Sequence, residues 1–228
     1  MHGSESYIYI IQTLIRAGFK MSLDWNSPST NNKLLLRHDI DFSVEHAFRL
    51  AKIESNLDVR STYFFMLTSN MYNLMSSRNC KLISDIRDMG HKIAIHFDPT
   101  VYENLQSFDL EKKVFEYIFN VKIDIISIHR PGVFLDNNNV KICGVSQTYH
   151  DKYFKKMKYI SDSGGRDIFK IVNELSPDKT IGGLHLLVHP IWWIETANSP
   201  TQALNQWKRW NNEFIRSEIK DNCKSYID

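Results

Sequence analysis

The chain has 228 residues, enough to bury a full hydrophobic core as one domain. Its 28 Lys and Arg against 26 Asp and Glu leave a net charge of +2, which favours neither nucleic acid nor an acidic membrane as a partner. A hydrophobic content of 43% and a charged content of 24% are typical of a soluble globular protein.

The cysteines and the apolar segments indicate the cellular compartment in which we expect the protein. Cys80, Cys143 and Cys223 are scattered and show no C-x-x-C spacing, which fits a reducing compartment and argues against a disulfide framework. The N-terminus lacks a basic region followed by an apolar core, and no stretch approaches about 18 continuous apolar residues. We therefore expect a cytoplasmic protein that does not insert into membranes. The sequence leaves its oligomeric state open.

Helix and strand patterns alternate through the first half of the chain. Apolar residues at helical spacing precede Gly18, a suitable C-cap, and Ser43 can cap the next helix. Helical patterns cover residues 7–15, 44–51, 82–89 and 110–118, and strand patterns cover residues 34–41, 61–67, 91–96 and 123–128.

The second half continues the alternation less clearly. Residues 140–158 are the hardest to assign, with a possible strand near 144–148, and further strands are expected at 157–161 and 183–188. A helix over 204–219 closes the chain. There is no repeat, linker or low-complexity tract, so we expect a single domain over residues 1–228. Six or seven β-α units with strands apolar on both faces predict a parallel sheet, either an open sheet or a closed barrel.

Polar side chains gather where the predicted strands end. The C-terminal ends of parallel strands are where barrel enzymes build their sites, so these residues predict one common site. In chain order they are Asp39 and Asp41, Asn70 and Tyr72, His96 and Asp98, His129 and Arg130, Asp162, and His189.

Two of these residues are typical metal ligands. Asp41 and His96 offer the oxygen and nitrogen donors that bind a zinc-like cation and leave positions for water. Such a metal lowers the pKa of bound water and polarises a carbonyl oxygen, and Asp39 is then free to take the proton of the water. Arg130 would supply a fixed cation that holds Asp39 ionised.

A second titratable pair can supply the acid. His189 follows an apolar run and could protonate a leaving amine, while Asp162 could keep this histidine charged. For Asp162, a turn-forming role before the Gly164-Gly165 pair is an equally good interpretation.

These motifs resemble the polysaccharide deacetylases, the carbohydrate esterase family four. The resemblance spans residues 34–193, and its motifs occur in the order seen in that family. They are Arg37-His38-Asp39-Ile40-Asp41, Ser61-Thr62-Tyr63-Phe64-Phe65, Gly90-His91-Lys92-Ile93-Ala94-Ile95-His96, His129-Arg130-Pro131 and Leu187-Val188-His189-Pro190. The resemblance implies an α/β fold, a distorted (β/α) barrel of about seven parallel strands.

The resemblance also implies roles for six residues. Asp39 resembles the catalytic base of the family, Asp41 its metal aspartate and His96 its first metal histidine. In the same way Arg130 resembles the arginine that tethers the base, His189 the catalytic acid and Asp162 the aspartate that tunes it.

The chain departs from the family pattern in two places. Ile40 separates two aspartates that are usually adjacent, and Thr100 stands where the second metal histidine is expected. Asp98, His129 or water could complete the site, and we favour Asp98 because it belongs to the same strand tip as His96. The chain resembles a short, cytoplasmic-type branch associated with surface-polysaccharide assembly.

We therefore expect a hydrolase that depends on a divalent metal, expected to be zinc, and removes an N-acyl group, expected to be acetyl. Its substrate would be a carbohydrate, an amino sugar in a glycan or glycan precursor. One alternative is an amidohydrolase acting on another linear C–N bond. The other is a degenerate barrel that binds a sugar or a partner without turnover, which the Thr100 departure would permit.

Overall fold

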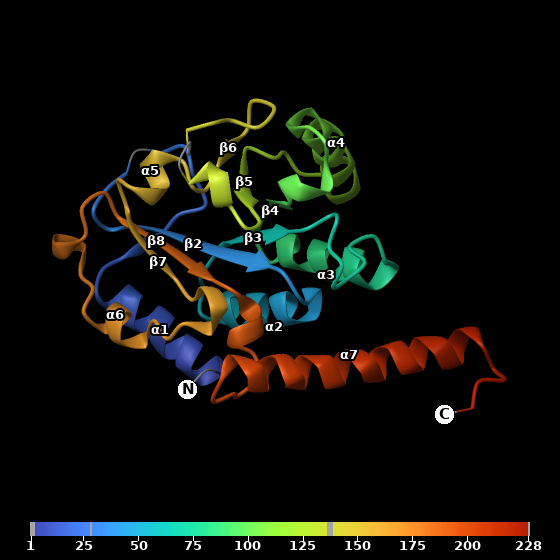
Figure 1. Cartoon of the computed structure of the whole chain (residues 1–228). Helices are drawn as coiled ribbons and strands as arrows, with labels where there is room; N and C mark the ends of the chain where they lie inside the picture. The colour runs from blue at the N-terminus through green and yellow to red at the C-terminus, as the bar shows by residue number, and fades with distance from the viewer. Residues whose placement is uncertain (1–2, 28, 136–138, 228) are drawn as a thin grey trace.

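The computed structural model describes residues 3–27, 29–135 and 139–227, in which parallel strands curl into a distorted barrel surrounded by helices (Figure 1). Hydrogen-bonded neighbours follow the order β6-β5-β4-β3-β2-β8-β7, and β1 pairs with β2 outside this path. The strands are β1 (Lys20–Met21), β2 (Lys33–Ile40), β3 (Thr62–Phe65), β4 (Lys92–Phe97), β5 (Ile125–Ile128), β6 (Ser146–Gln147), β7 (Lys158–Ser161) and β8 (Leu184–Val188).

The helices cover the outside of the strands, and α7 extends past the barrel at its lower edge (Figure 1). None of the described helices is both long enough and apolar enough to cross a membrane. The helices are α1 (Ser4–Arg16), α2 (Val44–Asn56), α3 (Ser77–Asp88), α4 (Phe108–Phe119), α5 (Asp151–Phe154), α6 (Phe169–Asn173) and α7 (Pro200–Asn222).

The predicted distorted (β/α) barrel is confirmed, and each predicted strand has a counterpart in the sheet. The uncertain stretch near residues 144–148 holds β6, which has only two residues. The two-residue strand β1 and the short helices α5 and α6 were not predicted, because such brief elements leave too few residues to show a period. Ser43 caps α2 as expected, its side chain accepting from the backbone N–H of His46.

Strand β2 determines where the site forms. All of its eight residues are buried, so each side chain meets either the barrel interior or the surrounding helices. Because side chains alternate along a strand, Arg37, Asp39 and Asp41 point to one face and His38 and Ile40 to the other. The register pairs Asp39 with Phe64 of β3 and Arg37 with Leu187 of β8, which brings the C-terminal ends of these strands to one edge.

A buried carboxylate on α2 holds the other face of β2. Glu54 is fully buried and accepts hydrogen bonds from His38 Nε2 at 2.9 Å, Ser61 Oγ at 2.6 Å and Tyr63 OH at 2.7 Å. Tyr7 of α1 donates to the same carboxylate. Burial acts to raise the pKa of Glu54, but the neighbouring His38 lowers it to about 2. One ionised group therefore joins α1, α2, β2 and the start of β3.

Glu54→Ala should destabilise the fold strongly, because it leaves several buried donors without an acceptor. We expect the free energy of unfolding to fall by roughly 3–5 kcal/mol, the usual cost of removing one partner of a buried ionic network. Urea unfolding followed by circular dichroism measures it, with the exposed Glu103→Ala as the matched control, expected within about 0.5 kcal/mol of wild type. A loss below about 1 kcal/mol would show that the network does not anchor β2.

Candidate active site

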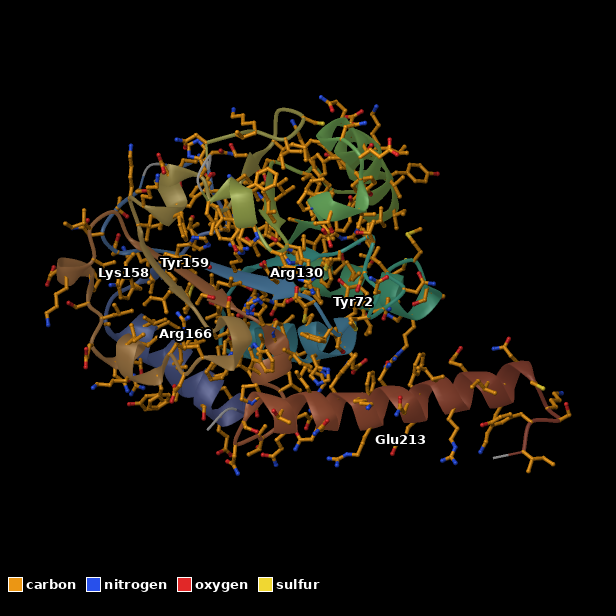
Figure 2. All side chains as sticks on the ribbon, in the orientation of Figure 1. Tyr72, Arg130, Lys158, Tyr159, Arg166 and Glu213 are labelled. Carbon is orange, nitrogen blue, oxygen red and sulfur yellow. The ribbon has the colours of Figure 1, made fainter. Side chains whose placement is uncertain are left out.

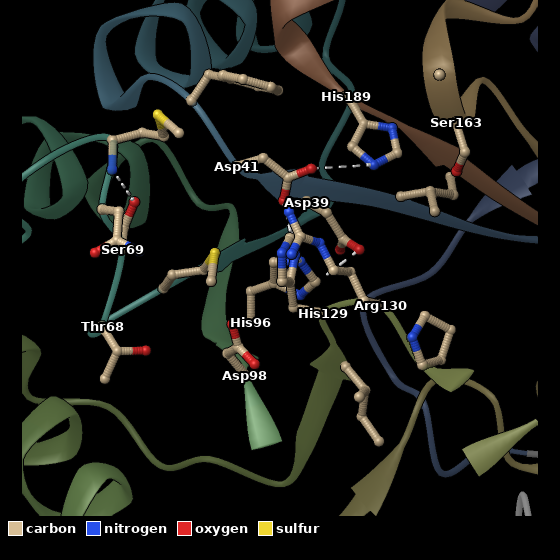
Figure 3. A pocket seen from close by; sticks show the side chains of 18 of the residues that line it. Asp39, Asp41, Thr68, Ser69, His96, Asp98, His129, Arg130, Ser163 and His189 are labelled. Carbon is tan, nitrogen blue, oxygen red and sulfur yellow. Dashed lines mark hydrogen bonds and ion pairs between the residues drawn. The ribbon is translucent and has the colours of Figure 1, made fainter. Parts of the chain in front are cut away.

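The strand ends meet in one pocket of about 390 Å³. Figure 3 shows the carboxylates and imidazoles of several strands converging there. Among the residues lining the pocket are Asp39, Asp41, His96, Asp98, His129, Arg130 and His189. Asp162 is fully buried and reaches the pocket through its hydrogen bond to His189. The structure thus brings the predicted site residues together at one edge of the barrel.

Asp41, His96 and His129 form a compact group in which one ligand atom of each lies within 4.8 Å of the others. His96 Nε2 lies 3.1 Å from Asp41 Oδ1 and 3.2 Å from His129 Nδ1, and His129 Nδ1 lies 3.6 Å from Asp41 Oδ1. Burial acts to raise the pKa of Asp41, but the two imidazoles hold it well below its usual value. The group is therefore a concentrated set of donor atoms around one point.

Two observations fit this group to a divalent cation. Asp41 Oδ1 is buried and, although His96 Nε2 lies 3.1 Å away, no contact within the described ranges has hydrogen-bond geometry to it, whereas buried carboxylate oxygens are normally hydrogen-bonded. His96 Nδ1 lies 2.6 Å from Ser127 Oγ, an outer hydrogen bond that fixes the ring and leaves Nε2 facing the group. One carboxylate oxygen with two imidazole nitrogens is a donor set that suits a zinc-like ion and leaves a position for water.

The third member of this group is His129, whereas the sequence analysis favoured Asp98. Asp98 Oδ1 accepts from the backbone N–H of Thr100 at 2.9 Å and from Thr100 Oγ1 at 2.6 Å. It thereby caps the short 3₁₀ helix η1 (Pro99–Val101), and its carboxylate lies outside the group. Thr100, where the resemblance led us to expect a histidine, thus donates to a carboxylate that acts as a cap.

Asp39 is held by an arginine of its own strand. Arg37 Nε donates to Asp39 Oδ1 at 2.9 Å and Arg37 Nη2 donates to Oδ2 at 2.6 Å, a bidentate pair. Arg37 is fully buried, with its guanidinium 4.9 Å from the ring centre of Tyr149. Burial acts to raise the pKa of Asp39, but Arg37 lowers it to about 2.

Arg130, predicted for this tethering role, does not perform it. It is exposed, and no hydrogen bond or ion pair joins it to Asp39 in the described part of the chain. Its backbone φ of 48° is left-handed and directs the chain away after His129. The missed residue, Arg37, carries a sequence signal: two residues apart on a strand, Arg37 and Asp39 share a face.

His189 and Asp162 form the second titratable pair. His189 Nδ1 lies 2.6 Å from Asp162 Oδ1, and the backbone N–H of His189 donates to Asp162 Oδ2 at 2.9 Å. Trp193 Nε1 donates to the same Oδ2 at 2.6 Å, so Asp162 is held on both oxygens. Burial acts to lower the pKa of His189, but Asp162 raises it to about 9.

The two pairs approach different members of the three-residue group. His96 Nδ1 is 3.7 Å from Asp39 Oδ2, and His189 Nε2 is 3.9 Å from Asp41 Oδ2. Figure 3 shows His189, which follows β8, facing Asp41, which follows β2. The pocket therefore offers an ionised carboxylate and a protonated imidazole close to a position suited to a cation.

Comparison with proteins of known structure identifies the fold. No family model matches the chain, and no curated protein matches it either. Among solved structures, a peptidoglycan deacetylase from Bacillus subtilis is 11% identical with a TM-score of 0.50, and the match covers 90% of this chain and 100% of that one.

Two further structures are similar to the chain over 82% of its length. The chitin deacetylase of the fungus Colletotrichum lindemuthianum is 18% identical over 84% of its own chain, with a TM-score of 0.49. A mutant of a CE4 family pseudoenzyme from Bacillus anthracis is 15% identical with a TM-score of 0.46, and the chain spans 64% of its length. At such identities similarity speaks for the fold alone, and the chain has a polysaccharide-deacetylase-like fold.

Proposed function

We propose that the protein is a metal-dependent hydrolase that removes an N-acyl group, acetyl in the first instance, from an amino sugar of a glycan or glycan precursor. The observation that carries this proposal is the placement of Asp39 and His189 next to the group Asp41, His96 and His129, Asp39 close to His96 and His189 close to Asp41. The peptidoglycan deacetylase from Bacillus subtilis, which shares the fold, supports the same class of reaction and substrate.

Asp39 is proposed as the base. When bound by Asp41, His96 and His129, a divalent ion, for which zinc is our choice, lowers the pKa of water and polarises an acyl oxygen. A base beside that position must be ionised to accept a proton, and the Arg37 pair keeps Asp39 ionised across the neutral range. The same bidentate pair fixes the orientation of the carboxylate, so that little motion precedes proton transfer.

His189 is proposed as the acid. Cleavage of an amide needs a proton on the departing nitrogen, because an amine anion is a very poor leaving group. His189 Nε2 faces the pocket, while Nδ1 is held by Asp162. With its pKa raised to about 9, the imidazole carries the required proton at neutral pH.

Two alternative functions differ from this proposal, one in the substrate that the pocket accepts and the other in the absence of turnover. An amidohydrolase for another linear C–N bond would use the same base and acid. A binding-only barrel was suggested by Thr100, but His129 supplies a further nitrogen donor beside Asp41, which favours a working site.

We also propose that residues 1–228 act as one catalytic domain in the cytoplasm, where the free thiols of Cys80, Cys143 and Cys223 would stay reduced.

The cation site predicts a clear division among single variants. His96→Ala and His129→Ala should each lose metal affinity by more than the roughly 10–100-fold typical of outer-shell partners, because each removes a proposed ligand. Asp98→Ala is the matched control and should keep its metal. Metal content after dialysis against zinc, measured by mass spectrometry, decides between them. If Asp98→Ala loses the metal and His129→Ala retains it, Asp98 is the third ligand after all.

The base assignment predicts a contrast between two arginines. Asp39→Asn should lower kcat by about 10²–10⁴-fold with metal content retained, the usual worth of a positioned base. Arg37→Gln should also lower kcat, because Asp39 then loses its orienting partner, whereas Arg130→Gln should leave kcat within about tenfold of wild type. Acetate release from an N-acetylated oligosaccharide provides the rates. Near-normal turnover by Asp39→Asn would place the base elsewhere.

If His189 is the acid, the pH dependence of kcat should shift when Asp162 is substituted. Since His189 must be protonated to act, kcat should fall as pH rises through about 9, the pKa that Asp162 sustains. Asp162→Asn removes the negative charge, so the pKa of His189 should drop towards its usual 6.5 and the alkaline limb should move to lower pH. His189→Ala should lose that limb together with most of the turnover. An alkaline limb at the same pH in Asp162→Asn would contradict the assignment.

A further inference from the structure

Side chains fill the space between strands β2 and β8 and the helices α1 and α2 that cover them (Figure 2). This layer is largely apolar, and Leu34, Leu36 and Val188 contribute to it from the two strands. His38 points into the same layer, because it lies an even number of residues along β2 from Leu34 and Leu36. Its imidazole is fully buried, so both ring nitrogens need partners.

Both ring nitrogens of His38 face hydrogen-bond acceptors. Nε2 lies 2.9 Å from Glu54 Oε1 of α2, and Nδ1 lies 3.1 Å from the backbone carbonyl oxygen of Val188 in β8. A carbonyl oxygen only accepts, and the ionised carboxylate of Glu54 also accepts from Tyr7 and Tyr63. Each ring nitrogen must therefore carry a proton and donate it. His38 is thus a charged link between α2 and the backbone of β8.

The carbonyl that His38 holds belongs to the peptide group that leads into His189, the proposed acid. The N–H of this same peptide group donates to the carboxylate of Asp162, at 2.9 Å from Oδ2 and 3.1 Å from Oδ1. One peptide group is therefore held at both edges, its oxygen by a cation from β2 and its N–H by an anion that follows β7. We call this pair of contacts the peptide clamp.

The peptide clamp acts at the point where the sheet ends. The last register pair between β2 and β8 joins His38 to Val188, and β8 ends at Val188. His189 follows, and Pro190, which has no N–H to donate, then begins the 3₁₀ helix η6 (Pro190–Trp192). The direction in which His189 points therefore depends on the peptide group before it.

A second set of contacts reaches the acid pair from the same layer. The ring centre of Tyr7 lies 6.3 Å from that of His38 and 6.0 Å from that of Trp193. Trp193 Nε1 in turn donates to Asp162 Oδ2 at 2.6 Å. Because Glu54 accepts from both Tyr7 and His38, its network borders the acid pair along two lines of contact.

We propose that His38 is a positioning residue for the acid: its doubly protonated imidazole, anchored by Glu54, fixes the peptide group that aims His189 into the pocket. The inference rests on the proposed function and deepens it, because it extends the machinery of the acid to the opposite face of β2. A displacement of about 1 Å at a reacting group can cost up to about 100-fold in rate. His38 does not line the described pocket, so its loss should affect turnover rather than substrate binding.

Two amide variants separate the two contacts of His38. Asparagine can place its amide N–H where Nδ1 lies and keep the contact with Val188, whereas glutamine can place it where Nε2 lies and keep the contact with Glu54. Both lose the positive charge beside Glu54, so both should unfold at lower urea concentration than wild type. Only His38→Gln releases the peptide group, so it should lower kcat by about 10–100-fold with KM and metal content unchanged. The conservative His38→Asn should keep kcat within about threefold of wild type.

The matched control is Ser61→Ala. Ser61 Oγ donates to Glu54 Oε2 at 2.6 Å, so this variant weakens the same buried network without touching the peptide clamp. It should unfold at lower urea concentration than wild type and keep the wild-type kcat. If His38→Gln turns over as fast as Ser61→Ala, or if His38→Asn loses as much as His38→Gln, His38 only stabilises the fold and the positioning role is wrong.

Hydrogen exchange decides on the peptide clamp without turnover. Exchange of the His189 N–H, which donates to Asp162, should be at least about tenfold faster in His38→Gln than in Ser61→Ala or His38→Asn when measured by NMR. The amide of Thr148, which donates to β5 at the other end of the sheet, is the internal reference. Equal exchange of the His189 amide in the three variants would overturn the peptide clamp. If no N-acetylated sugar is turned over, the proposed function fails, and this comparison still decides.

One measurement needs no variant. In isotope-labelled wild-type protein, the NMR signals of the His38 ring should show a proton on Nδ1 across the neutral range, because this nitrogen donates to a carbonyl. A ring without that proton would overturn the peptide clamp, even if His38→Gln does not fold.

Discussion

The buried ion pair between Arg37 and Asp39 is the interaction on which the architecture of the site depends. Both residues lie on β2, at the centre of the barrel, and both are nearly inaccessible to solvent. A charge in such a place is costly unless it is paired and hydrogen-bonded, and the bidentate geometry meets this need. On the opposite face of the same strand, His38 is compensated by Glu54. Strand β2 therefore carries ionisable groups on both faces, and neighbouring elements are arranged to satisfy them.

The same need for partners applies elsewhere in the pocket, where His96 and His189 are each held by a second group. Ser127 holds His96, and Asp162 holds His189 through both its imidazole and its backbone N–H. These partners come from the neighbouring strand or the loop beyond it, because the parallel register brings strand ends level. Preorganised contacts of this kind reduce the motion needed before proton transfer, which is what the proposed chemistry requires.

The barrel and the general position of the site could be predicted, because apolar strands and polar strand ends are local patterns. Local patterns did not predict which side chains contact each other at the site. Asp98 and His129 both follow strands that end at the pocket, and only the structure shows that Asp98 instead caps the turn at Thr100. The sequence alone gives no indication of the role of Ser127, because its contact with His96 depends on the register of β4 and β5. Such pairings are set by three-dimensional packing between segments that lie far apart in sequence.

Arg37 is bound to Asp39 and Arg130 is not, and the position of Arg130 follows from where the hydrogen-bonded pairing of β5 ends. The backbone N–H of His129 still donates to the carbonyl of Phe97 at 2.8 Å, so His129 continues the alternation of Ser127 and points to the same face. Arg130 then adopts a left-handed backbone and leaves the sheet, an arrangement that costs a non-glycine residue about 1–2 kcal/mol. The turn thus directs His129 towards Asp41 and His96 and leaves Arg130 exposed at the rim of the pocket. The Arg37–Asp39 pair lies within β2 and therefore does not depend on this turn.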